Sequence, residues 1–321
     1  MNSELAINVS GLEKRYGPDT VLGGIDLAVQ TGSVFALLGP NGAGKTTTVR
    51  ILATLTRADA GEIQVAGFDV VRERHKVRRA ISLTGQNAAL DALQTGEENL
   101  TMMGRLAGLS SRDARARSLR LLEDFELAEA GHRRVAAYSG GMRRRLDVAA
   151  SLVGSPSVIF LDEPTTGLDP RGRATTWDII AGLAESGITI FLTTQYLEEA
   201  DRLADHIAVL DRGTIAAAGT PTELKARFTD QRLDLTLADA ASFAFVAARL
   251  GSRAVSTDRD RLILGVATDG SAAHARALLD EIDPERCAVT RFVVNGATLD
   301  DVFMALTGHA AVDETRELEV A

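Results

Sequence analysis

The chain has 321 residues, of which 45% are hydrophobic, 25% charged and 4% aromatic, the balance of a folded globular protein with about two domains. Its formal net charge of −9 argues against nonspecific nucleic-acid binding, because that binding needs a dense positive surface. The single cysteine, Cys287, excludes an intramolecular disulfide and an all-cysteine metal site.

The N-terminus, MNSELAINVS, lacks the basic end and apolar run of a secretion signal, so we expect a cytosolic chain. None of the apolar runs that follow approaches the roughly 20 residues that a membrane-spanning helix needs. These runs alternate with helical patterns, which indicates an α/β core on a parallel sheet covered on both faces. They begin near Ile7, Val34, Glu62, Ala80, Val158, Ile188 and Ile207.

Two regions depart from this alternation. Between Thr95 and Leu152 helical spacing replaces the strand signal, which indicates a helical insert within the α/β domain. From Leu233 onward short strand patterns alternate with helical ones, which indicates a small α+β appendage. We therefore expect one domain over residues 1–228, with a helical subdomain at about 87–155, and a second over residues 229–321.

The segment GPNGAGKTT follows an apolar strand and precedes a helical pattern, which is the context of a phosphate-binding loop. Its glycines let backbone N–H groups point at a triphosphate, and the helix adds its positive N-terminal end. Lys45 supplies a charge to the β- and γ-phosphates, and the Thr46 hydroxyl is suited to Mg²⁺. The predicted nucleotide contacts are Gly39, Pro40, Asn41, Gly42, Ala43, Gly44, Lys45, Thr46 and Thr47.

A second apolar strand, in VIFLDEPTTGLDP, ends in two carboxylates. Asp162 is suited to hold Mg²⁺, and Glu163 can orient or deprotonate an attacking water. Adjacent carboxylates at the end of a buried strand repel each other unless a cation or substrate is present. The alternative is a strand that simply ends at the surface.

Ser139, Gly140 and Gly141 open a helix between these two motifs, so that a hydroxyl and backbone N–H groups converge on one anion-binding point. GPNGAGKTT, SGGM and VIFLDEPTTGLD, in this order, resemble the ATP-binding cassette (ABC) ATPases over residues 1 to about 225. The resemblance implies a P-loop NTPase core with a helical insert and an N-terminal antiparallel β portion. It also implies ATP and Mg²⁺ as cofactors.

The resemblance assigns further residues. Tyr16 is similar to the aromatic side chain that stacks on adenine, although a core position is the alternative. Gln86 resembles the loop glutamine that contacts Mg²⁺ and the membrane partner. Asp169, with Gly167 and Leu168, matches the loop that touches the other nucleotide site.

In this family the phosphate loop and the SGG segment act on the same ATP from opposite subunits, so the resemblance implies a homodimer. The main departure from the family pattern is Gln195, where most members carry histidine. A glutamine can donate a hydrogen bond to the γ-phosphate but cannot carry charge or relay a proton. We expect Glu163, Lys45 and Gln195 to support hydrolysis that is slower or less sensitive to pH.

Three features resemble the ATP-binding subunits of daunorubicin-resistance-type drug exporters: the segment Thr95–Leu109, the segment ATLDDVFMALTG near the C-terminus, and Gln195. This resemblance implies a peripheral subunit at the cytoplasmic face of the membrane, which powers export of a hydrophobic drug or natural product through a separate permease. Two alternatives stay open: a soluble ABC-type ATPase, and a weakly hydrolysing nucleotide switch. The arginine-rich stretches fit solvated helix faces and no nucleic-acid partner.

Overall fold

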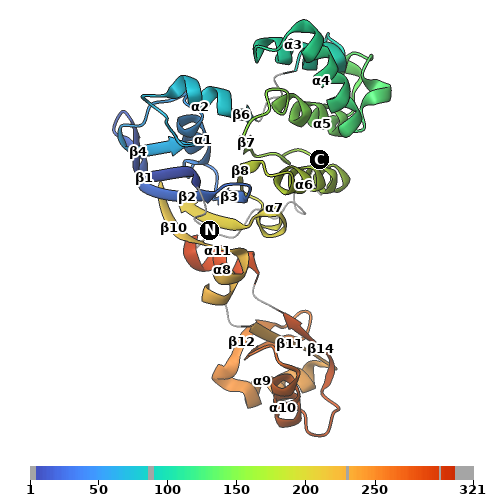
Figure 1. The fold of residues 1–321 in the computed structure, drawn as a ribbon. Coiled ribbons are helices and arrows are strands. Elements are labelled where there is room, and N and C mark those ends of the chain that lie inside the picture. The colour runs from blue at the N-terminus through green and yellow to red at the C-terminus, as the bar shows by residue number, and fades with distance from the viewer. Residues whose placement is uncertain (1–4, 86–89, 229–230, 296–297, 308–321) are drawn as a thin grey trace. The chain divides into compact units, whose positions relative to one another are not determined.

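The computed structural model describes residues 5–85, 90–228, 231–295 and 298–307. Contacts divide the chain into two compact units, one that runs to Pro221 and one that begins at Thr222 (Figure 1). Among the described residues, no helix combines the length and the apolar character needed to cross a membrane. Each unit is described by itself below.

The first unit is built on a six-stranded sheet in the order β10-β9-β3-β8-β7-β6. Five strands are parallel and the edge strand β10 is antiparallel to β9. Every residue of β3, β7 and β8 is buried, as expected for central strands between two helical layers, so the predicted α/β P-loop class is confirmed. The strands are β3 (Val34–Leu38), β6 (Ile81–Thr84), β7 (Val158–Asp162), β8 (Thr189–Thr194), β9 (His206–Asp211) and β10 (Thr214–Gly219).

Helices connect these strands and flank the sheet. They are α1 (Lys45–Leu52), α2 (Arg74–Ala80), α6 (Pro170–Glu185) and α7 (Leu197–Leu203) (Figure 1). Aromatic rings fill the centre of the sheet: the ring centroids of Phe35 and Phe191 lie 5.4 Å apart, and those of Phe160 and Phe191 lie 5.6 Å apart. The loops at the carboxyl ends of β3, β7 and β8 start from this rigid base, and they carry the predicted site residues.

A second, antiparallel sheet corrects one prediction. The runs near Ile7 and Glu62 do not join the parallel sheet, because they pair with each other, with Ile7 opposite Val65. The strand that follows the Ile7 run returns through a short turn and pairs with that run, and a short turn permits only antiparallel pairing. The strands, in the sheet order β2-β1-β4-β5, are β2 (Asp19–Gln30), β1 (Leu5–Tyr16), β4 (Ala60–Val65) and β5 (Phe68–Asp69). This sheet is the N-terminal antiparallel portion that the family resemblance implied.

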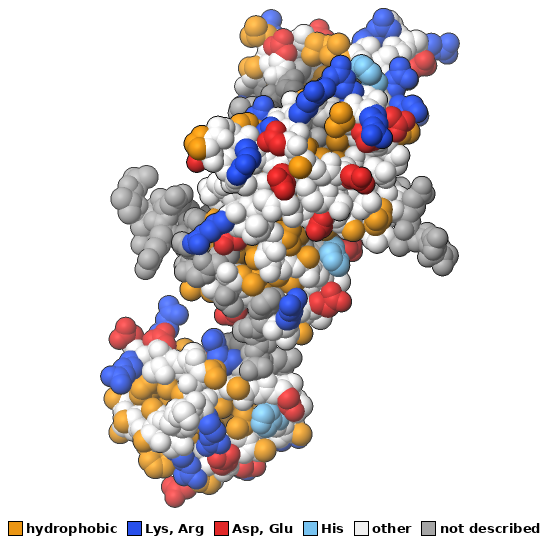
Figure 2. Space-filling model, turned by 90° about the vertical axis from the view of Figure 1, so that its left-hand side faces the viewer, with side chains coloured by type: hydrophobic (Ala, Val, Ile, Leu, Met, Phe, Trp, Pro, Cys, Tyr) orange, Lys and Arg blue, Asp and Glu red, His pale blue; other side chains and the backbone are white. Residues whose placement is uncertain are grey.

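The helical insert consists of α3 (Gly96–Leu106), α4 (Ser111–Asp124) and α5 (Gly140–Ser151), with 3-10 turns at Ala128–Ala130 and Val135–Ala137. Side-chain caps start all three helices. Thr95 and Glu98 form a reciprocal capping box on α3, and the Ser110 and Ser139 hydroxyls accept N–H groups at the starts of α4 and α5. On the face drawn in Figure 2, acidic side chains lie among the basic ones over this region at the top of the molecule.

The second unit contains a four-stranded antiparallel sheet in the order β12-β13-β11-β14, with two helices packed on it. The element order β-α-β-β-α-β with this strand order is the ferredoxin-like arrangement. It agrees with the predicted α+β appendage. The elements are α8 (Pro221–Phe228), β11 (Gln231–Leu237), α9 (Ala240–Leu250), a 3-10 turn (Gly251–Arg253), β12 (Ala254–Asp258), β13 (Ile263–Thr268), α10 (Ala272–Ile282), β14 (Val289–Asn295) and α11 (Leu299–Thr307).

Candidate nucleotide site

The loop between β3 and α1 needs glycine at its two ends. A Cβ atom at Gly39 would collide with the carbonyl oxygen of Leu210, so the loop can leave the sheet only without a side chain there. Gly44 has a φ of 111°, and a Cβ atom there would lie 2.7 Å from Leu22 Cδ2. The loop therefore packs tightly against Leu210 and Leu22, and this packing fixes the position of the N-terminus of α1.

Lys45 is only 5% exposed, and its ammonium group bonds back to the start of the loop. Its Nζ donates to the carbonyl oxygens of Gly39 at 2.8 Å and Pro40 at 3.1 Å, and lies 3.7 Å from Glu163 Oε1. Burial lowers the pKa of Lys45, whereas the carboxylates of Glu163 and Asp162 act in the opposite direction. The structure thus brings together the lysine of the first motif and the acids of the second.

Asp162 is buried at the end of β7, with its carboxylate among hydroxyl groups. Its Oδ1 accepts from Thr193 Oγ1 at 2.5 Å and from Thr46 Oγ1 at 3.3 Å. Glu163 has a φ of 51°, a left-handed backbone that is costly for a residue with a side chain. Its N–H holds that conformation by donating to the Thr193 carbonyl at 3.0 Å and to the Thr193 hydroxyl at 3.2 Å.

Gln195 follows β8, the strand between β3 and β7. The Gly39 N–H donates to the Thr194 carbonyl at 3.3 Å, so the chain ends that carry Gly39, Glu163 and Gln195 converge at one edge of the sheet. Gln195 is half-buried there.

A buried network lies behind this edge and links α5, α6 and α7. Glu199 Oε1 accepts from Thr165 Oγ1 at 2.8 Å and from Trp177 Nε1 at 3.1 Å. Burial raises the pKa of Glu199, against the effect of its hydrogen-bond donors and of nearby Arg144. Arg144 Nη1 donates to Asp147 Oδ2 at 3.1 Å, while its Nε and Nη2 have no partner among the described residues. Sequence reasoning missed this network, because its members are far apart in the chain.

The SGG segment lies at the start of α5 in the same unit. Ser139 and Asp169 cap α5 and α6, and both line a cavity of about 550 Å³ together with Gly140 and Gly141. A second cavity, of about 490 Å³, runs between Gly140 and Glu163. None of the residues lining these two cavities belongs to the loop 39–47. Ser139 and Asp169 therefore line a cavity that the loop does not reach, whereas Glu163 shares a cavity with Gly140.

Two predicted residues remain, and the structure describes only one of them. Tyr16, at the end of β1, is 49% exposed, and Lys14 Nζ lies 5.3 Å from its ring centroid. The hairpin of β1 and β2, which carries Tyr16, contacts the phosphate loop, because the Leu22 side chain of β2 packs against Gly44. Gln86 lies outside the described residues, shortly after the end of β6 at Thr84.

A glycine loop between a buried strand and a helix, with a lysine held beside the acids of a neighbouring strand, defines a P-loop nucleoside triphosphatase. Comparisons with known proteins identify the family within this class. The family profile described as ABC transporter matches residues 22–166, and the profile for the C-terminal domain of DrrA1-3-like ATP-binding proteins matches residues 219–307.

Curated relatives match almost the whole chain. The daunorubicin resistance ATP-binding protein DrrA3 of Streptomyces coeruleorubidus is 51% identical over 99% of this chain and 100% of its own. The doxorubicin resistance ATP-binding protein DrrA of Mycobacterium tuberculosis is 48% identical over 95% of both chains. A solved structure of an ATP-binding subunit of an ABC transporter is 28% identical, with a TM-score of 0.62, and covers 70% of this chain and 93% of its own.

The chain belongs to the ABC transporter ATP-binding proteins, in the daunorubicin and doxorubicin resistance branch. It is therefore a nucleotide-binding ATPase, as the sequence predicted.

Proposed function

We propose that two copies of this chain bind ATP between them, with the Lys45 loop of one copy facing Ser139 of the other. The observation that carries this proposal is the separation within one chain of the loop from the cavity lined by Ser139, Gly141 and Asp169. Both α5 and α6 begin at this cavity, and exposed helix N-termini suit an anion. A second copy would bring that anion, the triphosphate in its own loop.

The residues at the loop fit Mg²⁺. The Asp162 carboxylate and the Thr46 hydroxyl are hard oxygen donors that already contact each other. Mg²⁺ in NTPases is held by one or two protein oxygens together with substrate phosphates, so no larger acidic cage is required. We infer that Thr46, Asp162 and Gln86 hold the ion, which neutralises phosphate charge when bound.

The groups that do not hold Mg²⁺ have their own roles in hydrolysis. Glu163 accepts a proton from, or orients, the water that attacks the γ-phosphate, and its restrained backbone fixes the carboxylate direction. Lys45 and the loop N–H groups stabilise negative charge on the transferring group. Gln195 donates a hydrogen bond at the same edge, and Tyr16 stacks on the adenine.

The cycle of dimer closure and reopening powers export of a hydrophobic drug or natural product through a separate permease, at the cytoplasmic face of the membrane. The names of the curated relatives support this role, because they describe daunorubicin or doxorubicin resistance. The helices of the insert that follow Gln86 form the surface that receives the permease.

The dimer is tested by mixing two inactive variants, Lys45→Ala and Ser139→Ala. Each variant alone has two defective sites, but a mixed dimer has one intact site, so mixing restores ATPase activity. Light scattering of Glu163→Gln in ATP is expected to give the mass of two chains. A monomer in ATP, with a turnover per chain that stays constant far below micromolar concentration, would contradict the proposal.

A weakly hydrolysing switch is the second candidate, and Gln195 is the residue that favours it. Steady-state phosphate release separates the two candidates. For a motor, Glu163→Gln lowers a measurable wild-type rate by at least about 100-fold, whereas a switch gives the same low rate in both proteins.

A further inference from the structure

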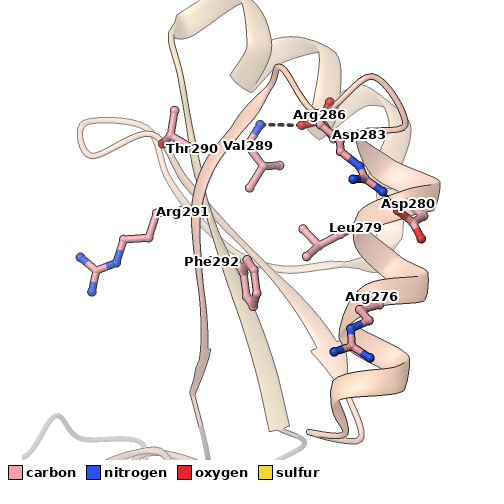
Figure 3. A pocket seen from close by; sticks show the side chains of 9 residues that line it. All are labelled: Arg276, Leu279, Asp280, Asp283, Arg286, Val289, Thr290, Arg291 and Phe292. Carbon is pink, nitrogen blue, oxygen red and sulfur yellow. Dashed lines mark hydrogen bonds and ion pairs between the residues drawn. The ribbon is translucent and has the colours of Figure 1, made fainter.

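The second unit carries a groove that nucleotide chemistry does not use. It lies between α10 and β14 and has a volume of about 470 Å³. Figure 3 shows α10 forming one wall and β14 the other. Among the described strands β14 pairs only with β11, so its other edge is an unpaired strand edge along the groove.

The groove continues the apolar core of the unit. Phe292 lies opposite the core residue Leu235, and residues opposite each other in adjacent strands share a face. Phe292 is nevertheless 49% exposed. Leu279 from α10 and Val289 from β14 also point into the groove (Figure 3). Apolar side chains therefore line a strand edge that no described element covers.

The charge left unmatched at the groove is positive. Arg286 lies 3.5 Å from Asp280, and the Asp283 carboxylate accepts three backbone N–H groups at 2.8–3.1 Å. The guanidinium groups of Arg276 and Arg291, in contrast, make no hydrogen bond or ion pair with the described residues. Arg276 extends from α10, whereas Arg291 points away from α10 on the other face of β14 (Figure 3). Both acids are thus occupied, while the two guanidinium groups, one on each side of β14, are available to a ligand.

We propose that this groove binds an extended acidic segment of a partner protein, which pairs with β14 as an additional strand. An open strand edge beside a helix is the geometry of peptide recognition by strand addition. Alternate side chains of such a strand point to opposite faces, so apolar ones contact Leu279 and Phe292 while acidic ones lie on the face of Arg291. The seven residues of β14 offer main-chain groups that a small anion would leave unused.

A second copy of this chain is a poorer occupant. Antiparallel pairing of two β14 edges would bring the positive groups of one copy, Arg276 and Arg291, close to those of the other. Like charges opposite each other destabilise a strand pair. Charge complementarity therefore selects an acidic partner.

Fluorescence anisotropy with the full-length chain tests the proposal. The probes are three labelled peptides: SEVEIEVES, its lysine counterpart SKVKIKVKS, and the acidic peptide N-methylated at alternate residues so that it cannot pair as a strand. We expect the acidic peptide to bind at least about tenfold more tightly than either of the others. It should also protect the β14 amides from hydrogen exchange.

Two charge reversals form a matched pair. Arg291→Glu is expected to weaken binding of the acidic peptide at least about tenfold, whereas Arg259→Glu, at the exposed turn after β12, changes it less than about twofold. Phe292→Ser provides a second groove variant with a loss in the same direction. Equal binding of the methylated peptide, equal effects of the two reversals, absence of binding, or dimerisation through β14 would each overturn the proposal.

Discussion

Replacing Glu199 with alanine should strongly destabilise the first unit. The change leaves the Thr165 hydroxyl and the Trp177 N–H without their buried acceptor, and it removes a negative charge near Arg144. Each buried donor left unsatisfied costs about 1–3 kcal/mol. Removing one member of a buried charged network costs about 3–5 kcal/mol in comparable cases. We expect a loss of about 3–5 kcal/mol in the free energy of unfolding.

Glu199→Gln is the matched control, because its amide oxygen can still accept from Thr165 and Trp177. Burial raises the pKa of Glu199, so the folded state holds its proton more tightly than the unfolded state does. That contribution to stability is complete below the ordinary glutamate pKa, and it is lost as the pH rises through the raised value. Glu199→Gln should remove this part of the pH dependence.

Urea unfolding followed by tryptophan fluorescence measures these effects directly. Trp177 is the only tryptophan in the chain, and its indole N–H donates to Glu199, so the signal reports on this network. Unfolding of the second unit contributes no tryptophan signal. A loss below about 1 kcal/mol in Glu199→Ala, or an equal loss in Glu199→Gln, would refute this account of the network.

Three further changes test the site. Lys45→Ala should reduce MgATP binding and ATPase activity by at least about 100-fold, as measured by isothermal titration and phosphate release, because no other described side chain places an amine in the loop. Thr193→Val removes the hydroxyl that donates to Asp162, so the Mg²⁺ concentration for half-maximal ATPase activity should rise about tenfold, while Thr193→Ser keeps the wild-type value. Gln195→His should raise turnover and add a pH dependence near the histidine pKa of about 6.5. An unchanged rate and pH profile would show that residue 195 does not act on the γ-phosphate.

The motifs could be predicted from the sequence because their chemistry is local. Gly39 to Thr47 and Asp162 to Glu163 each sit at the end of a fully apolar strand, and such strands lie side by side in a parallel sheet. Ser139 at a helix start is equally local, since a cap depends on the next three residues.

Long-range pairing could not be predicted in the same way. The strands near Ile7 and Glu62 are apolar enough for a central sheet, and only their partners reveal an antiparallel one. The support that Thr193 gives to Asp162 depends on strand order, which the sequence does not state. Glu199 looks like one more acid on a polar helix until the packing of α6 and α7 buries it.

The ferredoxin-like unit starts and finishes on neighbouring strands, with Arg232 opposite Asn295. Directly opposed residues in an antiparallel pair lie about 5 Å apart at their Cα atoms. A linker of a few residues could therefore bridge the gap if residues 232–295 were excised, and the ends of α8 and α11 would remain joined at their native spacing. Neighbouring ends of this kind make the insertion or removal of a module sterically easy, because the chain that it interrupts is not stretched.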